Sequence, residues 1–183
     1  MSKIAALVVA AALGLGAGAL LLAKPFEQAG AATIQPVWSE VEWPFLMDQW
    51  GKGKAFQCKA ADCGAEVKLY LRAKIGFCNC TTGVSDDEEL DRVADLELTG
   101  LQFTPLEPGH AIKVGTMNGR SRPYVVKPAP GIRTLALAFN ERCDVIAATA
   151  VVGRDPPGSL EPAVLAFLNS RTVLQWAEVT LGL

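Results

Sequence analysis

Hydrophobic and polar residues alternate along much of the middle of the chain, with the period of two that is typical of β-strands. The pattern is clearest in residues 66–79, where one face carries Val67, Leu69, Leu71 and Ala73 and the other carries lysine, tyrosine and arginine side chains. Similar patterns predict further strands at residues 55–59, 112–117, 120–126, 134–139 and 144–152. The sequence therefore predicts a domain in which strands dominate.

Turn residues between these strands indicate hairpin connections. Asn118-Gly119 is the dipeptide most favoured in a type I′ turn, so it predicts the tip of a hairpin. Residues 60–64 form a short connection between two predicted strands, and residues 140–142 join another pair. Because strands joined by such tight turns run antiparallel, the pattern predicts a mainly antiparallel sheet.

Short helices are predicted outside the strands. Residues 85–88 have the S-x-x-E form of a capping box, which predicts a helix that begins at Ser85 and ends at about residue 94. Ser159 predicts the start of another helix, and residues 45–50 predict a single helical turn. Residues 172–181 are expected to form a closing strand, although their Leu, Trp and Ala also suit a helix. The predicted fold class is α+β, a mainly antiparallel sheet built from hairpins with two or three short helices.

The first 32 residues differ from the rest of the chain. After Lys3, residues 4–23 are apolar without interruption, which is longer than a usual signal-peptide core and long enough to cross a bilayer. Ala29-Gly30-Ala31 has the small-x-small form that signal peptidase accepts. This hydrophobic helix is therefore either a cleaved signal peptide or a retained N-terminal membrane anchor. Both place residues 33–183 outside the cytoplasm, and the short lysine-led start favours the bacterial periplasm, with the domain soluble or anchored to the inner membrane.

Residues 33–183 have the size of one domain. They carry 15 lysines and arginines against 18 acids, which gives a net charge of −3. This balance argues against bulk nucleic-acid binding. The sequence contains no motif that points to a cofactor, and we expect none.

Four of the five cysteines lie within residues 58–80, in the spacing C-x4-C-x14-C-x-C, and the fifth is Cys143. Thiols that lie close together in an oxidising compartment become disulfides. Cys58 and Cys63 flank one tight connection, within the reach of a disulfide. Cys78 and Cys80 share one face of a strand and are expected to pair elsewhere. One free thiol and two disulfides allow fifteen arrangements, five choices of the free cysteine times three pairings, and the sequence does not select one.

A thiol-based site is the alternative interpretation of the same cysteines. Thiolates at Cys58, Cys63, Cys78 and Cys80 would suit copper(I) or zinc, and C-x-C is a compact chelating pair. However, the spacing lacks the paired C-x2-C of a zinc ribbon, and neither C-x-x-C nor C-x-x-C-H occurs. The sequence therefore favours a fold that disulfides stabilise.

His110 is the only histidine, so a catalytic Ser-His or Cys-His pair would have to use it. The G-x-S-x-G motif of a catalytic serine does not occur. The acidic run at residues 86–91 lacks the spacing of an EF-hand calcium loop and is better explained as the start of a capped helix. We therefore expect neither a metal site nor enzymatic activity.

Charge is unevenly distributed along the domain. Residues 85–107 contain eight acids and one base, whereas residues 108–140 contain five bases and no acid. The predicted Asn-Gly hairpin would carry two arginines at its tip, where guanidinium groups are preorganised for carboxylate or phosphate groups. The predicted binding residues are Arg120, Arg122, Lys113 and Lys127.

These observations predict a non-catalytic accessory or binding module of the bacterial cell envelope. Its partner would be an envelope or inner-membrane protein, or an anionic group, recognised through the basic hairpin face. The alternative is a periplasmic thiol redox factor, or a copper- or zinc-binding factor, built on the cysteine cluster.

Overall fold

The computed structural model describes residues 36–99, 102–127, 133–153 and 159–183. All of these residues belong to one unit, Thr33–Leu183. The predicted signal peptide or anchor, residues 1–32, lies outside the described residues. Within the described ranges, no helix has the length and hydrophobicity that crossing a bilayer requires.

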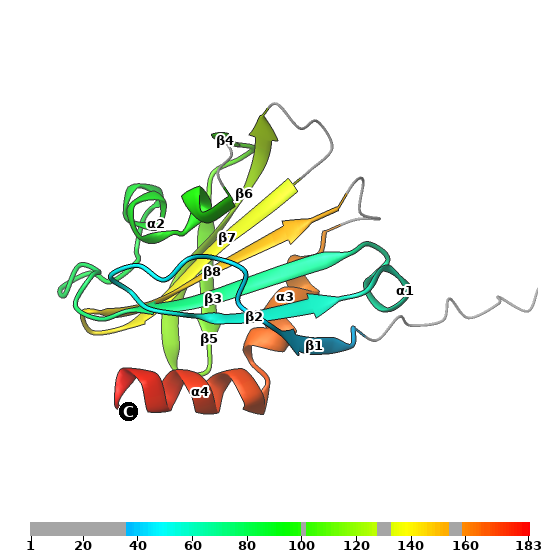
Figure 1. Ribbon diagram of the computed structural model, residues 1–183. Helices are drawn as coiled ribbons and strands as arrows, with labels where there is room; N and C mark the ends of the chain where they lie inside the picture. The colour runs from blue at the N-terminus through cyan, green and yellow to red at the C-terminus, as the bar shows by residue number, and fades with distance from the viewer. Residues whose placement is uncertain (1–35, 100–101, 128–132, 154–158) are drawn as a thin grey trace, which may run out of the picture. The chain divides into compact units, whose positions relative to one another are not determined.

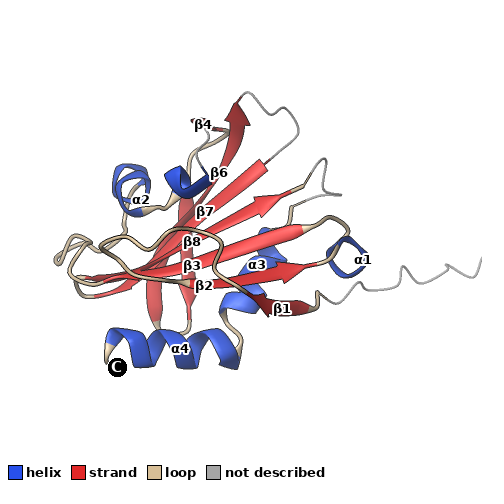
Figure 2. Cartoon of the chain, in the orientation of Figure 1, coloured by secondary structure: helices blue, strands red, loops and turns tan. Residues whose placement is uncertain are grey.

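Eight strands form one antiparallel sheet, as the alternating pattern predicts (Figure 1, Figure 2). The order across the sheet is β1-β2-β3-β8-β7-β6-β4, and β5 pairs with the part of β6 that β4 leaves free. The edge strands are therefore β1 on one side and β4 and β5 on the other. The strands are β1 (Trp38–Val41), β2 (Lys54–Cys58), β3 (Val67–Lys74), β4 (Gln102–Pro105), β5 (His110–Val114), β6 (Met117–Lys127), β7 (Arg133–Glu141) and β8 (Asp144–Val152).

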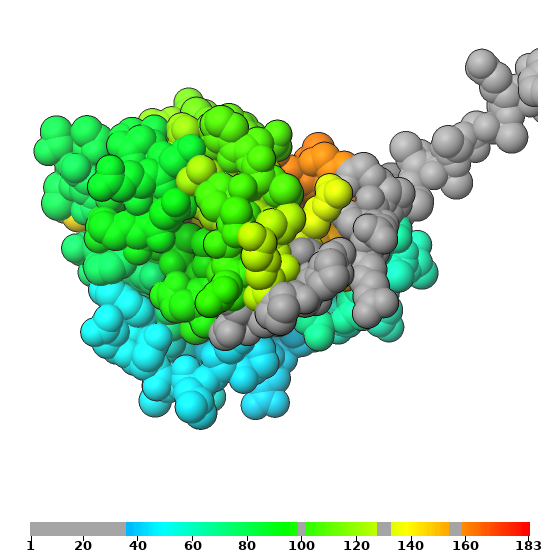
Figure 3. Space-filling model, turned by 90° about the horizontal axis from the view of Figure 1, so that it is seen from above, coloured from blue at the N-terminus to red at the C-terminus, as the bar shows by residue number. Residues whose placement is uncertain are grey.

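Helices cover both faces of the sheet. α3 (Glu161–Leu168) and α4 (Arg171–Leu181) pack on one face, the α4 face, and α2 (Asp87–Val93) packs on the other, the α2 face (Figure 1). Seen from above α2, the green segments, which include α2, cover most of the surface, and the cyan segment before β2 borders them (Figure 3). Two short segments, α1 (Ala60–Cys63) and the 3-10 helix η1 (Leu96–Thr99), lie in connections.

The larger apolar core lies on the α4 face, and its centre includes Leu69, Leu137 and Phe139. A smaller apolar core on the α2 face includes Leu90 and Tyr124. Successive residues of a strand point to opposite faces, so β7 and β8 each contribute to both cores. The sheet is therefore buried on two sides along its centre, which a simple apolar-in, polar-out pattern does not predict.

The predicted alternation in β3 is confirmed for its first half and changes in the second. Val67, Leu69 and Leu71 are fully buried on the α4 face. Arg72 and Lys74 belong to the predicted solvated face, yet each is only 3% exposed, because the segment around α2 covers them. Charged side chains in such a position require partners, which the next section describes.

The β5–β6 hairpin turns at Gly115-Thr116, so the prediction of a tip at Asn118-Gly119 is wrong. Asn118 and Gly119 lie inside β6, where they pair with β5. Gly115 has a φ of +59°, which suits the first central position of a type II′ turn. Gly119 serves a different purpose, because a Cβ there would lie only 2.1 Å from the carbonyl oxygen of Ala138 in β7. Packing against β7 thus explains this glycine.

Three predicted helix starts differ from the structure. α3 begins at Glu161 and its cap position is Leu160, one residue after the predicted Ser159. The cap of α2 is Asp86, one residue after the predicted Ser85, and its carboxylate accepts a hydrogen bond from the Glu89 amide at 2.8 Å. The predicted helical turn before Gly51 is a tight turn, in which the Gly51 amide donates to the Asp48 carbonyl oxygen at 3.0 Å. In the last two cases, a short polar side chain satisfies the backbone locally.

The C-terminal segment is α4, and the prediction of a closing strand there is wrong. Its buried residues Val173, Ala177 and Leu181 recur every four positions, which is the spacing of one helix face. Ser170 caps the helix by accepting a hydrogen bond from the Val173 amide at 3.5 Å. The Leu, Trp and Ala content of this segment therefore serves a helix that packs against the α4 face.

Candidate functional site

The two predicted binding arginines lie inside β6, on the α2 face, and not at an exposed tip. Arg120 Nε lies 2.5 Å from Asp87 Oδ1, and another nitrogen of the same guanidinium donates to the Gly109 carbonyl oxygen at 2.8 Å. Arg122 Nη1 donates to Asp91 Oδ2 at 3.0 Å. Both carboxylates belong to α2, so the two arginines fasten this helix to the sheet.

The electrostatics of this contact are complementary. Burial alone would raise the pKa of the Asp87 carboxyl, but hydrogen bonds from Arg120 and from the Gly109 amide outweigh it and hold that pKa below its ordinary value. The Tyr124 hydroxyl donates to Asp91, and burial together with this hydrogen bond raises the pKa of Tyr124. Two carboxylates of the acidic run, Asp87 and Asp91, are therefore neutralised by two arginines of β6 within the same chain.

The four predicted binding residues do not form one surface. Lys113 in β5 and Lys127 at the end of β6 are exposed. Lys113 pairs with Asn118, which precedes Lys127 by nine residues along β6. Nine residues of strand span about 30 Å. The two lysines are thus far apart, and the arginines between them are occupied by α2.

Two disulfides use four of the five cysteines. Cys58–Cys63 connects the end of β2 to α1, with the Cα atoms 6.0 Å apart. Cys80–Cys143 connects the segment after β3 to the β7–β8 turn. A sulfur in a disulfide is not a thiolate ligand. The described residues also contain no group of three or more His, Cys, Asp or Glu side chains that could hold a metal ion.

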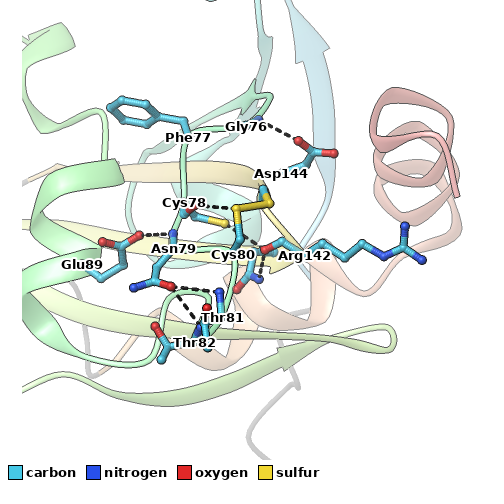
Figure 4. Close-up of a disulfide and its surroundings, with 12 residues drawn as sticks. Gly76, Phe77, Cys78, Asn79, Cys80, Thr81, Thr82, Glu89, Arg142 and Asp144 are labelled. Carbon is cyan, nitrogen blue, oxygen red and sulfur yellow. Dashed lines mark hydrogen bonds between the residues drawn. A yellow bond between two sulfur atoms is a disulfide. The ribbon is translucent and has the colours of Figure 1, made fainter.

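Cys78 is the free thiol and lies buried beside the second disulfide (Figure 4). Its amide donates to the Cys143 carbonyl oxygen at 3.0 Å, and its sulfur lies 3.2 Å from the Arg142 carbonyl oxygen. Burial, with the charges of Glu89 and Asp144, raises the pKa of the Cys78 thiol to about 11. Because the thiolate is the reactive form, this thiol reacts poorly at neutral pH.

A buried ionic cluster on the α2 face is a feature that the sequence does not predict. Arg72 donates to the two oxygens of Asp95 at 2.8 and 2.5 Å, and to Asp48 at 2.6 Å. Lys74 Nζ lies 2.8 Å from Asp95 Oδ1 and 2.8 Å from the Val93 carbonyl oxygen. Two cations face two carboxylates, so the cluster holds three segments together and leaves no net charge for a ligand.

A hollow on the α4 face, beside the start of α3, is the candidate binding site, and we call it the α3 cleft. Its volume is about 610 Å³. Its floor is formed by buried apolar side chains, whereas its rim contains more exposed residues, three of which are charged. The floor contains Leu135, Ala150, Val152 and Val164, and the rim contains Leu106, Glu107, Arg133, Ser159 and Glu161.

His110 reaches this cleft through Glu161. Its Nε2 lies 3.1 Å from Glu161 Oε1, and the side chains are 56% and 18% exposed. Glu161 Oε1 is fully covered but accepts no hydrogen bond of good geometry. Ser159 Oγ accepts from the Glu161 amide at 3.4 Å, and no hydrogen bond between Ser159 and His110 is described. Among the described contacts, no hydroxyl or thiol forms a hydrogen bond with the His110 imidazole.

Sequence reasoning singled out His110 but could not supply its partner. Glu161 lies 51 positions further along the chain, in the first turn of α3, and only the folded sheet brings the two together. The sequence does not predict the cleft floor, because its residues are indistinguishable from ordinary core residues of β7, β8 and α3. A concave surface is a property of the assembled sheet and helix.

No protein-family model matches this sequence, and no curated protein is found to be similar to it. The described residues form an antiparallel α+β domain with two disulfides, which fits an oxidising compartment outside the cytoplasm.

Proposed function

We propose that this protein is a non-catalytic binding module of the bacterial cell envelope and that it holds its partner in the α3 cleft. The observation that carries this proposal is the composition of the cleft, which has an apolar floor and a few charged groups at its rim. Ligand sites usually have this composition, and they usually enclose about 300–1,000 Å³. The cleft falls within that range.

Location in the envelope is supported by two disulfides and by the apolar run at residues 4–23. Disulfides persist where the compartment is oxidising, and such a run directs export or anchors the chain. The periplasm satisfies both conditions. Cleavage after the run would give a soluble protein, and retention would give a protein anchored to the inner membrane.

The cleft replaces the basic hairpin as the proposed site of recognition. Arg120 and Arg122 already pair with Asp87 and Asp91, so a partner would have to displace α2 to reach them. The thiol alternative is less well supported, because four sulfurs lie in disulfides and Cys78 is buried and protonated at neutral pH. A binding role through the cleft requires neither the displacement of α2 nor the reduction of a disulfide.

Photo-crosslinking in intact cells tests this proposal. Leu106 stands at the cleft rim and is 48% exposed, so Leu106→p-benzoylphenylalanine should give a discrete adduct on irradiation. Val179 on α4 is 77% exposed and lies outside the cleft, and the same substitution there is the matched control. An adduct from position 106 alone supports the proposal. The absence of that adduct, or the same adduct from both positions, would contradict it.

A further inference from the structure

We infer that the α3 cleft binds an amphipathic amine, with an aliphatic chain on the apolar floor and an ammonium group at Glu161. This inference rests on the proposed binding function and names the class of ligand. It depends on three properties of the cleft, which are the surroundings of the Glu161 carboxylate, the charges at the rim and the shape of the floor.

The Glu161 carboxylate lacks a permanent counter-charge. Its side chain is only 18% exposed, and Oε1 is fully covered without a hydrogen bond. A carboxylate in such surroundings is costly unless a cation or donor faces it. The neighbouring imidazole of His110, at 3.1 Å, carries a charge only when it is protonated. An ammonium group supplies both a permanent positive charge and hydrogen-bond donors.

The other charged rim residues favour a cation over an anion. Glu107 adds a second carboxylate, and Arg133 adds one guanidinium, so with a neutral imidazole the lining carries a net charge of −1. Among the described residues, Arg133 forms no ion pair with either glutamate. Its side chain is exposed to solvent, where its repulsion of a bound cation is screened.

The floor requires an apolar part in the ligand. Leu135, Ala150, Val152 and Val164 are all aliphatic, so the part of the cleft that they line is apolar. Each methylene that leaves water for such a surface strengthens binding by roughly fourfold. A small inorganic cation or ammonia would leave this floor uncovered.

The test compares ligands of matched size on the protein as isolated from the envelope. Hexylamine, 1-hexanol and hexanoate share one chain and differ in the head group. Calorimetry gives the dissociation constants, and methyl NMR shifts of Leu135, Val152 and Val164 show where the chain lies. We expect hexylamine to bind about tenfold more tightly than hexanol, as a charge-assisted hydrogen bond predicts. Butylamine, which is two methylenes shorter, should bind roughly fifteenfold more weakly than hexylamine.

The variants Glu161→Gln and Glu178→Gln complete the test. The first should reduce the preference for hexylamine over hexanol to less than about twofold, because the amide is neutral. The second removes an exposed carboxylate on α4, outside the cleft, and should leave the preference unchanged. Equal binding of hexylamine and hexanol by the unmodified protein, tighter binding of hexanoate, or no methyl shifts with any ligand would overturn the inference. An adduct at Leu106 would still support the binding function, so the two failures are distinguishable.

Discussion

The two disulfides lie in different surroundings and close loops of different length. Cys58–Cys63 is buried in the core of the α4 face and joins residues five positions apart. Cys80–Cys143 joins residues 63 positions apart, and Cys80 is exposed while Cys143 is half-buried. A free thiol lies beside the second bond and none lies beside the first. Location and loop length therefore vary together in this domain.

Because of this difference, the disulfide that is better shielded from reductant is not the one that stabilises the fold more. A disulfide stabilises a fold mainly by restricting the unfolded chain, and the effect grows with the length of the loop. The chain-entropy relation gives about 2 kcal/mol for the short loop and about 4 kcal/mol for the long one. The more stabilising bond is therefore the one that a reductant in solution reaches first, whereas the buried bond contributes less and is better shielded.

The largest expected effect is the loss of Cys80–Cys143. The substitutions Cys80→Ala and Cys143→Ala, made together with Cys78→Ala, should lower the free energy of unfolding by about 4 kcal/mol relative to Cys78→Ala alone. The reason is the long loop that the bond closes. Chemical denaturation followed by circular dichroism measures the change. A loss below about 1 kcal/mol would show that the long crosslink does not restrict the unfolded chain as proposed.

The next effect concerns the thiol beside this bond. The pKa of Cys78 is about 11, whereas an unperturbed cysteine has a pKa of 9.0. The thiolate fraction at pH 7.5 is therefore roughly 100-fold smaller in the folded protein, and alkylation by iodoacetamide should be slower by about this factor. Mass spectrometry of the alkylated peptide gives the rate, with the protein in denaturant as the control. Equal rates in both conditions would place this thiol in solvent.

The pH dependence of the same reaction has a definite sign. The folded protein keeps the Cys78 proton above the pH at which the unfolded chain releases it, so the alkylation rate should rise about tenfold per pH unit until the pH approaches 11. In denaturant the rise should level off near pH 9. A folded-state profile that also levels off near pH 9 would contradict the raised pKa.

The smallest expected effect is the loss of Cys58–Cys63. The substitutions Cys58→Ala and Cys63→Ala should lower the free energy of unfolding by about 2 kcal/mol, because the loop contains few residues. The same denaturation experiment measures it. If this loss equals or exceeds the loss at Cys80–Cys143, packing in the core outweighs loop entropy and the comparison reverses.

The same contrast explains which parts of the cysteine framework could be predicted. Cys58 and Cys63 are close in sequence, so a tight connection between two strands already brings them within reach. Cys80 and Cys143 meet because β3 and β8 are neighbours, with Lys74 opposite Val145. That neighbourhood depends on the order of strands in the whole sheet, which local patterns do not contain.

In the β5–β6 hairpin, packing of the core outweighs the local preference of Asn-Gly for a turn. Asn-Gly favours a turn at residues 118–119, but the observed turn places Ile112, Val114 and Met117 together in the core of the α4 face. A shift in register changes the neighbours of every side chain along both strands, so the core decides. The two arginines therefore contact α2 and do not lie at the exposed tip that the sequence predicts.

Most strands and the capped helix α2 follow from alternation and capping residues. The burial of Arg72 and Lys74 does not, because alternation cannot distinguish a solvated face from a second buried face. α4 could have been recognised from Val173, Ala177 and Leu181, whose spacing is helical, although the single residues also suit a strand.

The bond between Cys80 and Cys143 also has a consequence for the covalent connectivity of the molecule. It closes a ring of the backbone that contains α2 and the strands β4 to β7. A protease that cuts one peptide bond inside this ring releases no fragment, since both new ends remain linked through the sulfur bridge. Nicked molecules therefore keep nearly the same mass as intact ones until a reductant separates the two pieces.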